Sequence, residues 1–203
     1  MLLGNDVGNP LLAGSTVPAG PNAYDLAAGG EDIWGSNDQF HFAHETVSGD
    51  FVCRVRVEAV QPVNLYTKAG IMVRTGLEAD AAHVFYLVFP TNAPRNNNLG
   101  GYESQSRSSS GAPCIAFYPK DSGAEAGAFP VVFPHGWLKV ARSGNLFEFW
   151  TGQNGSEWRS YGKIVVKLPR KVLVGLAVTS HSPDALCTAR FRDYGLSNDP
   201  KNA

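Results

Sequence analysis

Alternation of apolar and polar residues is the dominant pattern along this chain of 203 residues. The clearest example is 51–58, where every second side chain is apolar and the residues between are charged or polar in most cases. A period of two is typical of a strand with one buried face. A second run, 68–74, places Ala69, Ile71 and Val73 on its predicted core face.

Further segments have the same character and are separated by turn residues. The segments 138–142 and 146–150 predict a hairpin around Ser143-Gly144-Asn145. Other predicted strands are 83–89, 164–166, 173–179 and 188–194, and predicted loops are 91–101, 104–113 and 120–127. The best helical candidate, 77–82, is long enough for one turn only. The pattern therefore predicts an all-β fold, a sandwich of two antiparallel sheets.

Five short segments carry a resemblance to a known family. They are Gly30–Gly35 running into Asp38–Phe42, Lys68–Arg74, Trp137–Asn145, Asn154–Trp158 and Val174–His181. In this order they resemble the concanavalin A-like jelly-roll domains of many secreted bacterial proteins, to which a domain of the yeast regulation-of-enolase proteins is related. The resemblance implies one jelly-roll domain over 1–197, with 198–203 as a tail.

Composition and charge exclude some classes of partner. The formal net charge is −1, which argues against nucleic acid, because a basic surface supplies most of the affinity in such complexes. No apolar run approaches the roughly 20 residues of a membrane span. The first residues lack the pattern of a signal peptide. Either the mature part of a secreted or cell-surface protein or a cytoplasmic protein fits this, and the resemblance favours the first.

Three cysteines give an odd count, so at least one thiol is free. Cys53 and Cys187 fall at inward strand positions, where two small buried side chains are favoured over a disulfide. Cys114 lies between Gly and Pro residues and is expected to be an exposed thiol. The sequence contains no Cys-x-x-Cys pair, so a zinc site is not expected.

Catalytic patterns are weak. Hydrolysis of a glycoside usually needs two carboxylates that flank the bond. The only Glu-x-Asp is Glu78-Ala79-Asp80, in turn-like sequence, and Glu148 is the single acid in the middle of a strong strand. A serine hydrolase would need a nucleophile elbow, and no Gly-x-Ser-x-Gly is present. The sequence therefore favours a protein without catalytic activity over an enzyme.

Outward strand positions give the candidate ligand-binding residues. Aromatic faces bind the C–H surfaces of sugars, while amide and charged groups bind hydroxyls. Loop aromatics that could surround such a site are Trp34, Tyr66, Tyr102 and Tyr118. The predicted ligand-binding residues are Gln39, His41, Lys68, Arg74, Glu148, Trp150 and His181. We expect these residues to gather on one surface, the concave sheet of the sandwich.

These residues predict a non-catalytic carbohydrate-binding or adhesion module whose partner is an oligo- or polysaccharide. One alternative is a glycoside hydrolase or polysaccharide lyase with Glu148, His41, His181 or Arg74 in catalytic roles. Another is a structural or protein-interaction module. A purely structural role also fits the pattern for His41, His181, Lys68 and Arg74.

A structural calcium ion is a further possibility, because jelly rolls of this class often hold one between their first and last strands. Such sites use carboxylate and carbonyl oxygens. Asp193, with Asp6 near the first strand, is the predicted position.

Overall fold

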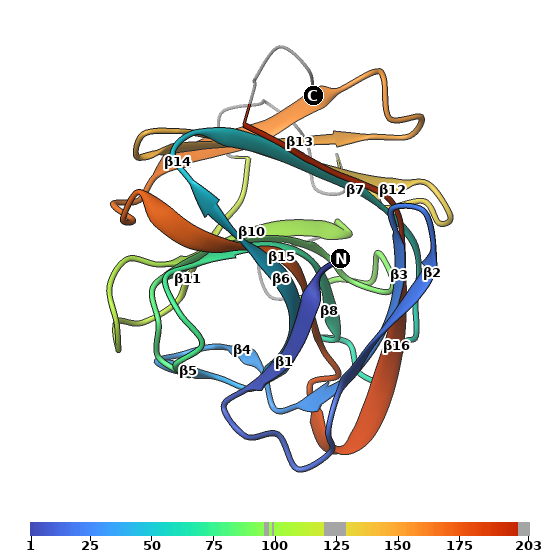
Figure 1. Ribbon diagram of the computed structural model, residues 1–203. Coiled ribbons are helices and arrows are strands. Elements are labelled where there is room, and N and C mark those ends of the chain that lie inside the picture. The colour runs from blue at the N-terminus through green and yellow to red at the C-terminus, as the bar shows by residue number, and fades with distance from the viewer. Residues whose placement is uncertain (96–97, 99, 120–128, 199–203) are drawn as a thin grey trace.

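The protein is an all-β sandwich of two seven-stranded antiparallel sheets, as the alternation predicts (Figure 1). The computed structural model describes residues 1–95, 98, 100–119 and 129–198, and the predicted loop 120–127 lies outside them. No helix that could span a membrane occurs in these ranges. The strands are β1 (Leu3–Val7), β2 (Ser15–Gly20), β3 (Ala23–Gly30), β4 (Ile33–Trp34), β5 (Asn37–Asp38), β6 (Phe40–Ser48), β7 (Phe51–Val60), β8 (Lys68–Arg74), β9 (His83–Val88), β10 (Tyr102–Arg107), β11 (Ile115–Phe117), β12 (Gly136–Ser143), β13 (Leu146–Gly152), β14 (Arg159–Val165), β15 (Lys171–Thr179) and β16 (Ser182–Ser197).

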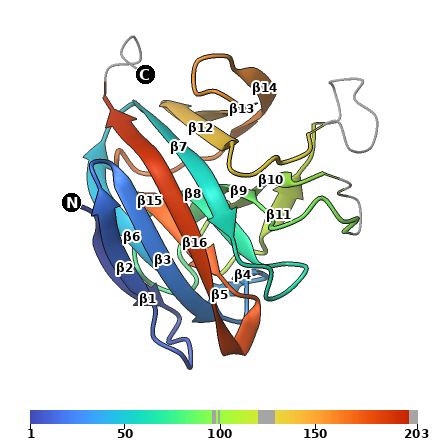
Figure 2. The ribbon, with the colours of Figure 1, turned by 90° about the vertical axis from the view of Figure 1, so that its right-hand side faces the viewer.

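In both large sheets, many neighbouring strands are not consecutive in the sequence, so distant parts of the chain lie side by side. Sheet A has the order β1-β6-β15-β8-β9-β10-β11, and sheet B has the order β14-β13-β12-β7-β16-β3-β2. Figure 2 looks onto sheet B, where the long strand β16 lies between β3 and β7. A separate two-stranded hairpin, β4–β5, lies on the side of sheet A away from β7, β12 and β13 (Figure 1).

The main core fills the space between the sheets and follows the predicted alternation. In β7, Phe51, Cys53, Val55 and Val57 have no exposed surface. Opposite them, sheet A contributes the predicted inward residues of β8. The predicted hairpin is confirmed, since β12 pairs with β13 around the turn at residues 144–145. Alternation predicts these contacts because successive side chains of a strand point to opposite faces.

The face of sheet A that points away from sheet B, which we call the outer face of sheet A, is also largely apolar. Its second core cluster includes Phe40, Phe42, Met72, Phe85 and Leu87, all without exposed surface, and β4 adds the side chain of Ile33. The hairpin therefore packs against this face instead of leaving it open to solvent. Alternation of apolar and polar residues does not predict such a cover, because the hairpin strands have only two residues each.

Strand β10 was not predicted, since the sequence predicts a loop over 104–113. The strand pairs with β9 and β11 and places Glu103, Gln105 and Arg107 on the outer face of sheet A. Polar side chains normally indicate a solvated segment. In this strand they are buried, because other polar groups of the protein bind them.

Candidate functional site

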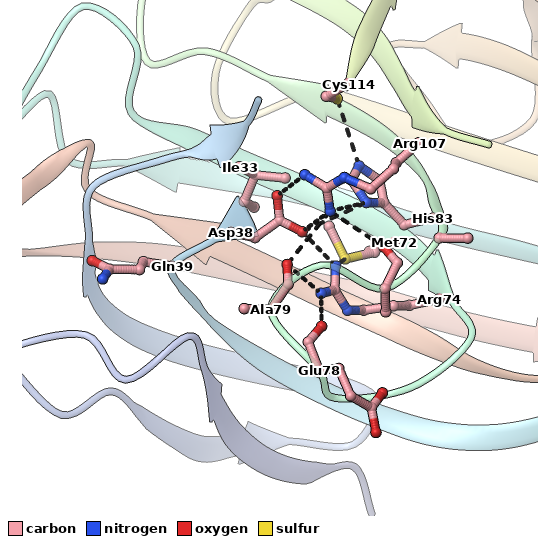
Figure 3. A network of polar contacts seen from close by, with 12 residues as sticks. Ile33, Asp38, Gln39, Met72, Arg74, Glu78, Ala79, His83, Arg107 and Cys114 are labelled. Carbon is pink, nitrogen blue, oxygen red and sulfur yellow. Dashed lines mark hydrogen bonds and ion pairs between the residues drawn. The ribbon is translucent and has the colours of Figure 1, made fainter. Parts of the chain in front are cut away.

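A buried ionic cluster fixes the β4–β5 hairpin to the outer face of sheet A (Figure 3). Asp38 of β5 accepts hydrogen bonds from Arg74 of β8, 2.7 Å, and from Arg107 of β10, 2.6 and 2.7 Å. His83 of β9 and Cys114 complete this group, which we call the Asp38 cluster. One carboxylate thus joins three neighbouring strands of sheet A to the hairpin.

Backbone carbonyl groups bind the remaining guanidinium donors. Arg74 donates to the carbonyls of Gly76, Glu78 and Ala79, and Arg107 to those of the hairpin, of Ala81 and of Ala112. Burial lowers the pKa of Arg74, and the carboxylate of Asp38 opposes that change. Charged groups are tolerated in an interior when they are paired and fully hydrogen-bonded. The Asp38 cluster therefore has a structural role, which is to hold the hairpin against sheet A.

The histidine of the cluster is neutral. Because an arginine can only donate, Nδ1 of His83 accepts from Arg107 at 3.3 Å, and Nε2 faces Sγ of Cys114 at 3.7 Å. Burial, together with the neighbouring guanidinium groups, lowers the pKa of His83 to about 3 despite the carboxylate of Asp38. Cys114 is buried, so the expectation of an exposed thiol is wrong. Burial raises its pKa to about 12.

Beside the hairpin, the outer face of sheet A has a pocket of about 200 Å³, which we call the sheet A pocket. Strands β8 and β10 and Phe89, the residue after β9, provide part of its wall, and the hairpin and the surrounding loops provide the rest. The residues that line it are Asp32, Trp34, Tyr66, Lys68, Phe89, Arg95, Glu103, Gln105, Tyr118 and His181.

Aromatic rings form a large part of this wall. Trp34, at the tip of the hairpin, is 42% exposed, and Nζ of Lys68 lies 5.6 Å from its ring centre. The ring of Tyr66 lies 6.5 Å from Phe89 and 5.3 Å from the imidazole of His181. Of the four loop aromatics proposed from the sequence, Trp34, Tyr66 and Tyr118 line the pocket. The fourth, Tyr102, packs in the main core instead.

An ion pair occupies one side of the pocket. Nζ of Lys68 donates to Oδ1 of Asp32 at 2.6 Å and to the carbonyl of Ile33 at 2.9 Å. Nδ1 of His181 lies 3.4 Å from the other carboxylate oxygen. Burial alone would raise the pKa of Asp32, but His181 and the ammonium group of Lys68 outweigh it and hold this pKa below its usual value. The carboxyl group of Asp32 is therefore ionised at neutral pH.

A second carboxylate lies on β10. Glu103 accepts hydrogen bonds from the hydroxyl of Tyr118 at 2.8 Å, from Nδ2 of Asn98 at 3.2 Å and from Nε2 of Gln105 at 2.6 Å. This last bond fixes the amide of Gln105, since the opposite orientation would place two acceptor oxygens against each other. Oε1 of Gln105 is then buried and has no hydrogen-bond partner among the described residues. A buried acceptor without a partner is costly.

The structure does not bring the seven predicted residues together. Lys68 and His181 line the sheet A pocket, whereas Arg74 belongs to the Asp38 cluster and has no exposed surface. Glu148 and Trp150 lie on β13 of sheet B, and because Phe147 and Phe149 face the core, these two side chains point away from sheet A. The prediction of one shared surface is therefore wrong, since alternation cannot tell which sheet a strand joins.

The remaining two residues lie at the edge of the sandwich. The imidazole of His41 is buried and joins the two sheets, with Nδ1 2.7 Å from Oδ1 of Asp6 on β1 and Nε2 2.8 Å from the hydroxyl of Thr16 on β2. Oε1 of Gln39 accepts from the backbone of Glu31 at 3.3 Å. In Figure 3 the side chain of Gln39 points away from the Asp38 cluster. Sequence alternation assigned His41 to an outward position because it identified Phe40 and Phe42 with the main core.

The two predicted metal ligands do not fit a calcium site. Asp6 binds His41 and the backbone N–H of Gly14, and Asp193 on β16 binds Nε of Arg56 at 2.7 Å. A calcium ion needs six to eight oxygen ligands. In the part of the chain that the structure describes, no group of three or more His, Cys, Asp or Glu residues could hold a metal ion.

Sequence reasoning missed several lining residues, above all Glu103, Gln105 and Arg95. The alternation Tyr102-Glu103-Ser104-Gln105-Ser106-Arg107 carries the signal for the first two, because every second residue has a large polar side chain. Serine-rich sequence follows directly and obscured it. Arg95 lies in a loop, where no periodicity predicts the direction of a side chain.

Strand order, sheet pairing and the two-layer core define a concanavalin A-like jelly roll. The chain is similar to a functionally unknown protein from Saccharomyces cerevisiae, with a TM-score of 0.63 and 16% identity over 93% of this chain and 98% of that one. No protein-family model and no curated protein sequence matches it.

Two bacterial enzymes contain a similar fold. One is the GH43 protein BlXynB, as a mutant, from Bacillus licheniformis, with a TM-score of 0.56 and 14% identity over 95% of this chain and 38% of that chain. The other is xylan beta-1,4-xylosidase from Bacillus halodurans, with a TM-score of 0.53 and 18% identity over 94% and 38%. This chain thus spans well under half the length of either enzyme. At these identities the likeness shows the fold alone, and activity has to be argued from the site.

Proposed function

We propose that this protein is a non-catalytic carbohydrate-binding module and that the sheet A pocket is its binding site. The observation that carries the proposal is the combination of an aromatic wall with carboxylate and amide side chains that line the same small pocket. Trp34, Tyr66 and Tyr118 can cover the C–H faces of a sugar ring, and the polar residues of β10 can bind its hydroxyl groups. A secreted or cell-surface location is part of this proposal.

Binding of a glycan panel, followed by titration calorimetry of the best ligand, tests the proposal. In Trp34→Ala we expect about a tenfold loss of affinity, equivalent to about 1.4 kcal/mol of lost stacking. Trp150→Ala is the matched control, because it removes the same side chain from sheet B. Loss of binding in Trp150→Ala with full binding in Trp34→Ala would move the site to sheet B. Failure of every glycan to bind the wild-type protein would refute the proposal.

A carbohydrate-active enzyme is the second candidate, because the pocket contains two carboxylates, Asp32 and Glu103. The environment of these groups favours binding instead. A general acid needs a raised pKa, whereas the pKa of Asp32 is lowered. The carboxylate of Glu103 already accepts three hydrogen bonds. Release of sugars from a polysaccharide panel, abolished by Glu103→Gln and retained in Glu148→Gln, would establish the enzyme.

A further inference from the structure

We infer that the sheet A pocket selects one neutral sugar unit and discriminates against uronic acids and other acidic sugars. This inference rests on the proposed function and adds the class of ligand. It follows from how the protein already uses the charged groups of the pocket.

The guanidinium group of Arg95 is not available to an acidic ligand. It makes five hydrogen bonds, the number of its N–H groups, to the carbonyls of Leu65, Ala93, Gly100 and Thr91 and to the hydroxyl of Thr91. Its carbon lies 4.1 Å from the ring centre of Phe89, so the group is also stacked. Arg95 therefore organises the loop around the pocket and has no donor left for a ligand carboxylate.

The ammonium group of Lys68 is likewise engaged. Two of its three donors bind Asp32 and the carbonyl of Ile33, and the side chain is almost fully buried. A ligand carboxylate that approached Lys68 would compete with Asp32, which is held in place by the backbone N–H of Ile33 as well. The cation of this pair therefore offers little to a second anion.

Charge balance leads to the same expectation. Two cations, Lys68 and Arg95, and two carboxylates, Asp32 and Glu103, line the pocket, so their formal charges cancel when His181 is counted as neutral. The Asp38 cluster nearby has one excess positive charge, but its guanidinium groups have no exposed surface and donate to backbone carbonyls. A ligand carboxylate would lose its hydration without gaining a free cation, which is unfavourable.

Besides the third donor of Lys68 and the imidazole of His181, the pocket has acceptor capacity that the protein does not use. A carboxylate such as that of Glu103 can accept about four hydrogen bonds, of which three are used. Gln105, whose Oε1 is buried without a partner among the described residues, lines the pocket beside it. Hydroxyl groups of a neutral sugar supply the matching donors. The volume of about 200 Å³ lies below the roughly 300–1,000 Å³ of sites for drug-sized ligands, which favours a single sugar unit.

Matched pairs of sugars test the inference on the wild-type protein. We propose to compare glucose with glucuronate, galactose with galacturonate and mannose with mannuronate by ligand-observed NMR and calorimetry. We expect at least one neutral sugar to bind, and its uronate to bind at least tenfold more weakly. Equal or tighter binding of the uronate would overturn the inference while the proposed function stood. Binding of neither member of any pair, and of no glycan in the panel, would instead refute the proposed function.

A variant then tests the role of the β10 residues. Glu103→Gln removes one negative charge and lets the amide of Gln105 turn, so that the pocket gains a positive balance and a donor. We expect the preference for the neutral sugar to fall by at least fivefold. Glu148→Gln, the same substitution on sheet B, should leave the preference unchanged. An unchanged preference in folded Glu103→Gln would contradict the inference.

Salt provides a measurement that needs no variant. Affinity for a neutral sugar should change by less than twofold between about 50 mM and about 500 mM NaCl, because screening acts on charge–charge attraction. A steep loss of affinity with salt would show that a ligand charge is recognised, and the inference would be wrong.

Discussion

Substitution of Asp38 by Asn should destabilise the protein strongly, because it removes the only carboxylate that contacts Arg74 and Arg107 among the described residues. All three side chains have no exposed surface. The variant keeps the size of the side chain but places an amide donor among guanidinium donors. Two buried cations then lack a counter-charge.

The magnitude follows from this geometry. Loss of one partner from a buried ion pair typically costs about 3–5 kcal/mol, because a charge is left uncompensated. Asp38 contacts two guanidinium groups through three hydrogen bonds of 2.6 to 2.7 Å, so we expect a value near the upper end of this range. For a domain of this length, a loss of about 5 kcal/mol corresponds to a Tm lower by roughly 10–20 °C.

Urea denaturation followed by circular dichroism measures this loss, with Asp193→Asn as the control. Asp193 makes a similar 2.7 Å contact with Arg56, but its side chain is 53% exposed, and exposed pairs contribute about 0–1 kcal/mol. Asn is also tolerated at the positive φ of 58° found there. A loss below about 1 kcal/mol in Asp38→Asn, or equal losses in the two variants, would refute the argument that burial gives the Asp38 cluster a large contribution to the free energy of unfolding.

Three further predictions concern pH and local contacts. Because the pKa of His83 is about 3 in the folded state and about 6.5 when unfolded, the unfolded state binds the extra proton between these values. Stability should therefore fall as the pH decreases from 6.5, by about 1.4 kcal/mol per pH unit from this group, and urea melts of His83→Asn should lack this part of the slope. Native Cys53, Cys114 and Cys187 should resist iodoacetamide at pH 8 and react after unfolding, because burial raises their pKa values; rapid labelling of the native protein would contradict their burial. Tyr118→Phe removes one hydrogen bond to a carboxylate and should lower the free energy of unfolding by about 1.5–3 kcal/mol, and a neutral result in urea melts would show that this contact is not formed.

Cysteine positions show how far local pattern can lead. Cys53 and Cys187 fall on alternating strands, and both are buried free thiols as predicted. The prediction for Cys114 is wrong, because its flanking Gly and Pro residues indicate a turn but not what lies above that turn. The hairpin residue Gly35 accepts a hydrogen bond from the backbone of Cys114, and this contact joins segments almost 80 residues apart.

In the candidate site, too, local pattern predicts some features correctly and others not. Three of the four loop aromatics proposed from the sequence line the sheet A pocket together with Lys68 and His181, and whether they bind a ligand stays a prediction. The prediction that Glu148 and Trp150 belong to the same surface is wrong, because they point away from the core on sheet B. Their alternation was interpreted correctly, but a strand has the same period whichever sheet it joins.

The sequence alone determines that the chain forms a two-sheet sandwich, because the period of apolar residues fixes which face of each strand is buried. Tertiary structure decides which strands are neighbours, and so which polar residues meet. The small hairpin held by Asp38 packs against the outer face of sheet A and has a pocket beside it. No local pattern encodes that arrangement, since it depends on one carboxylate that meets arginines from strands 36 and 69 residues further along the chain.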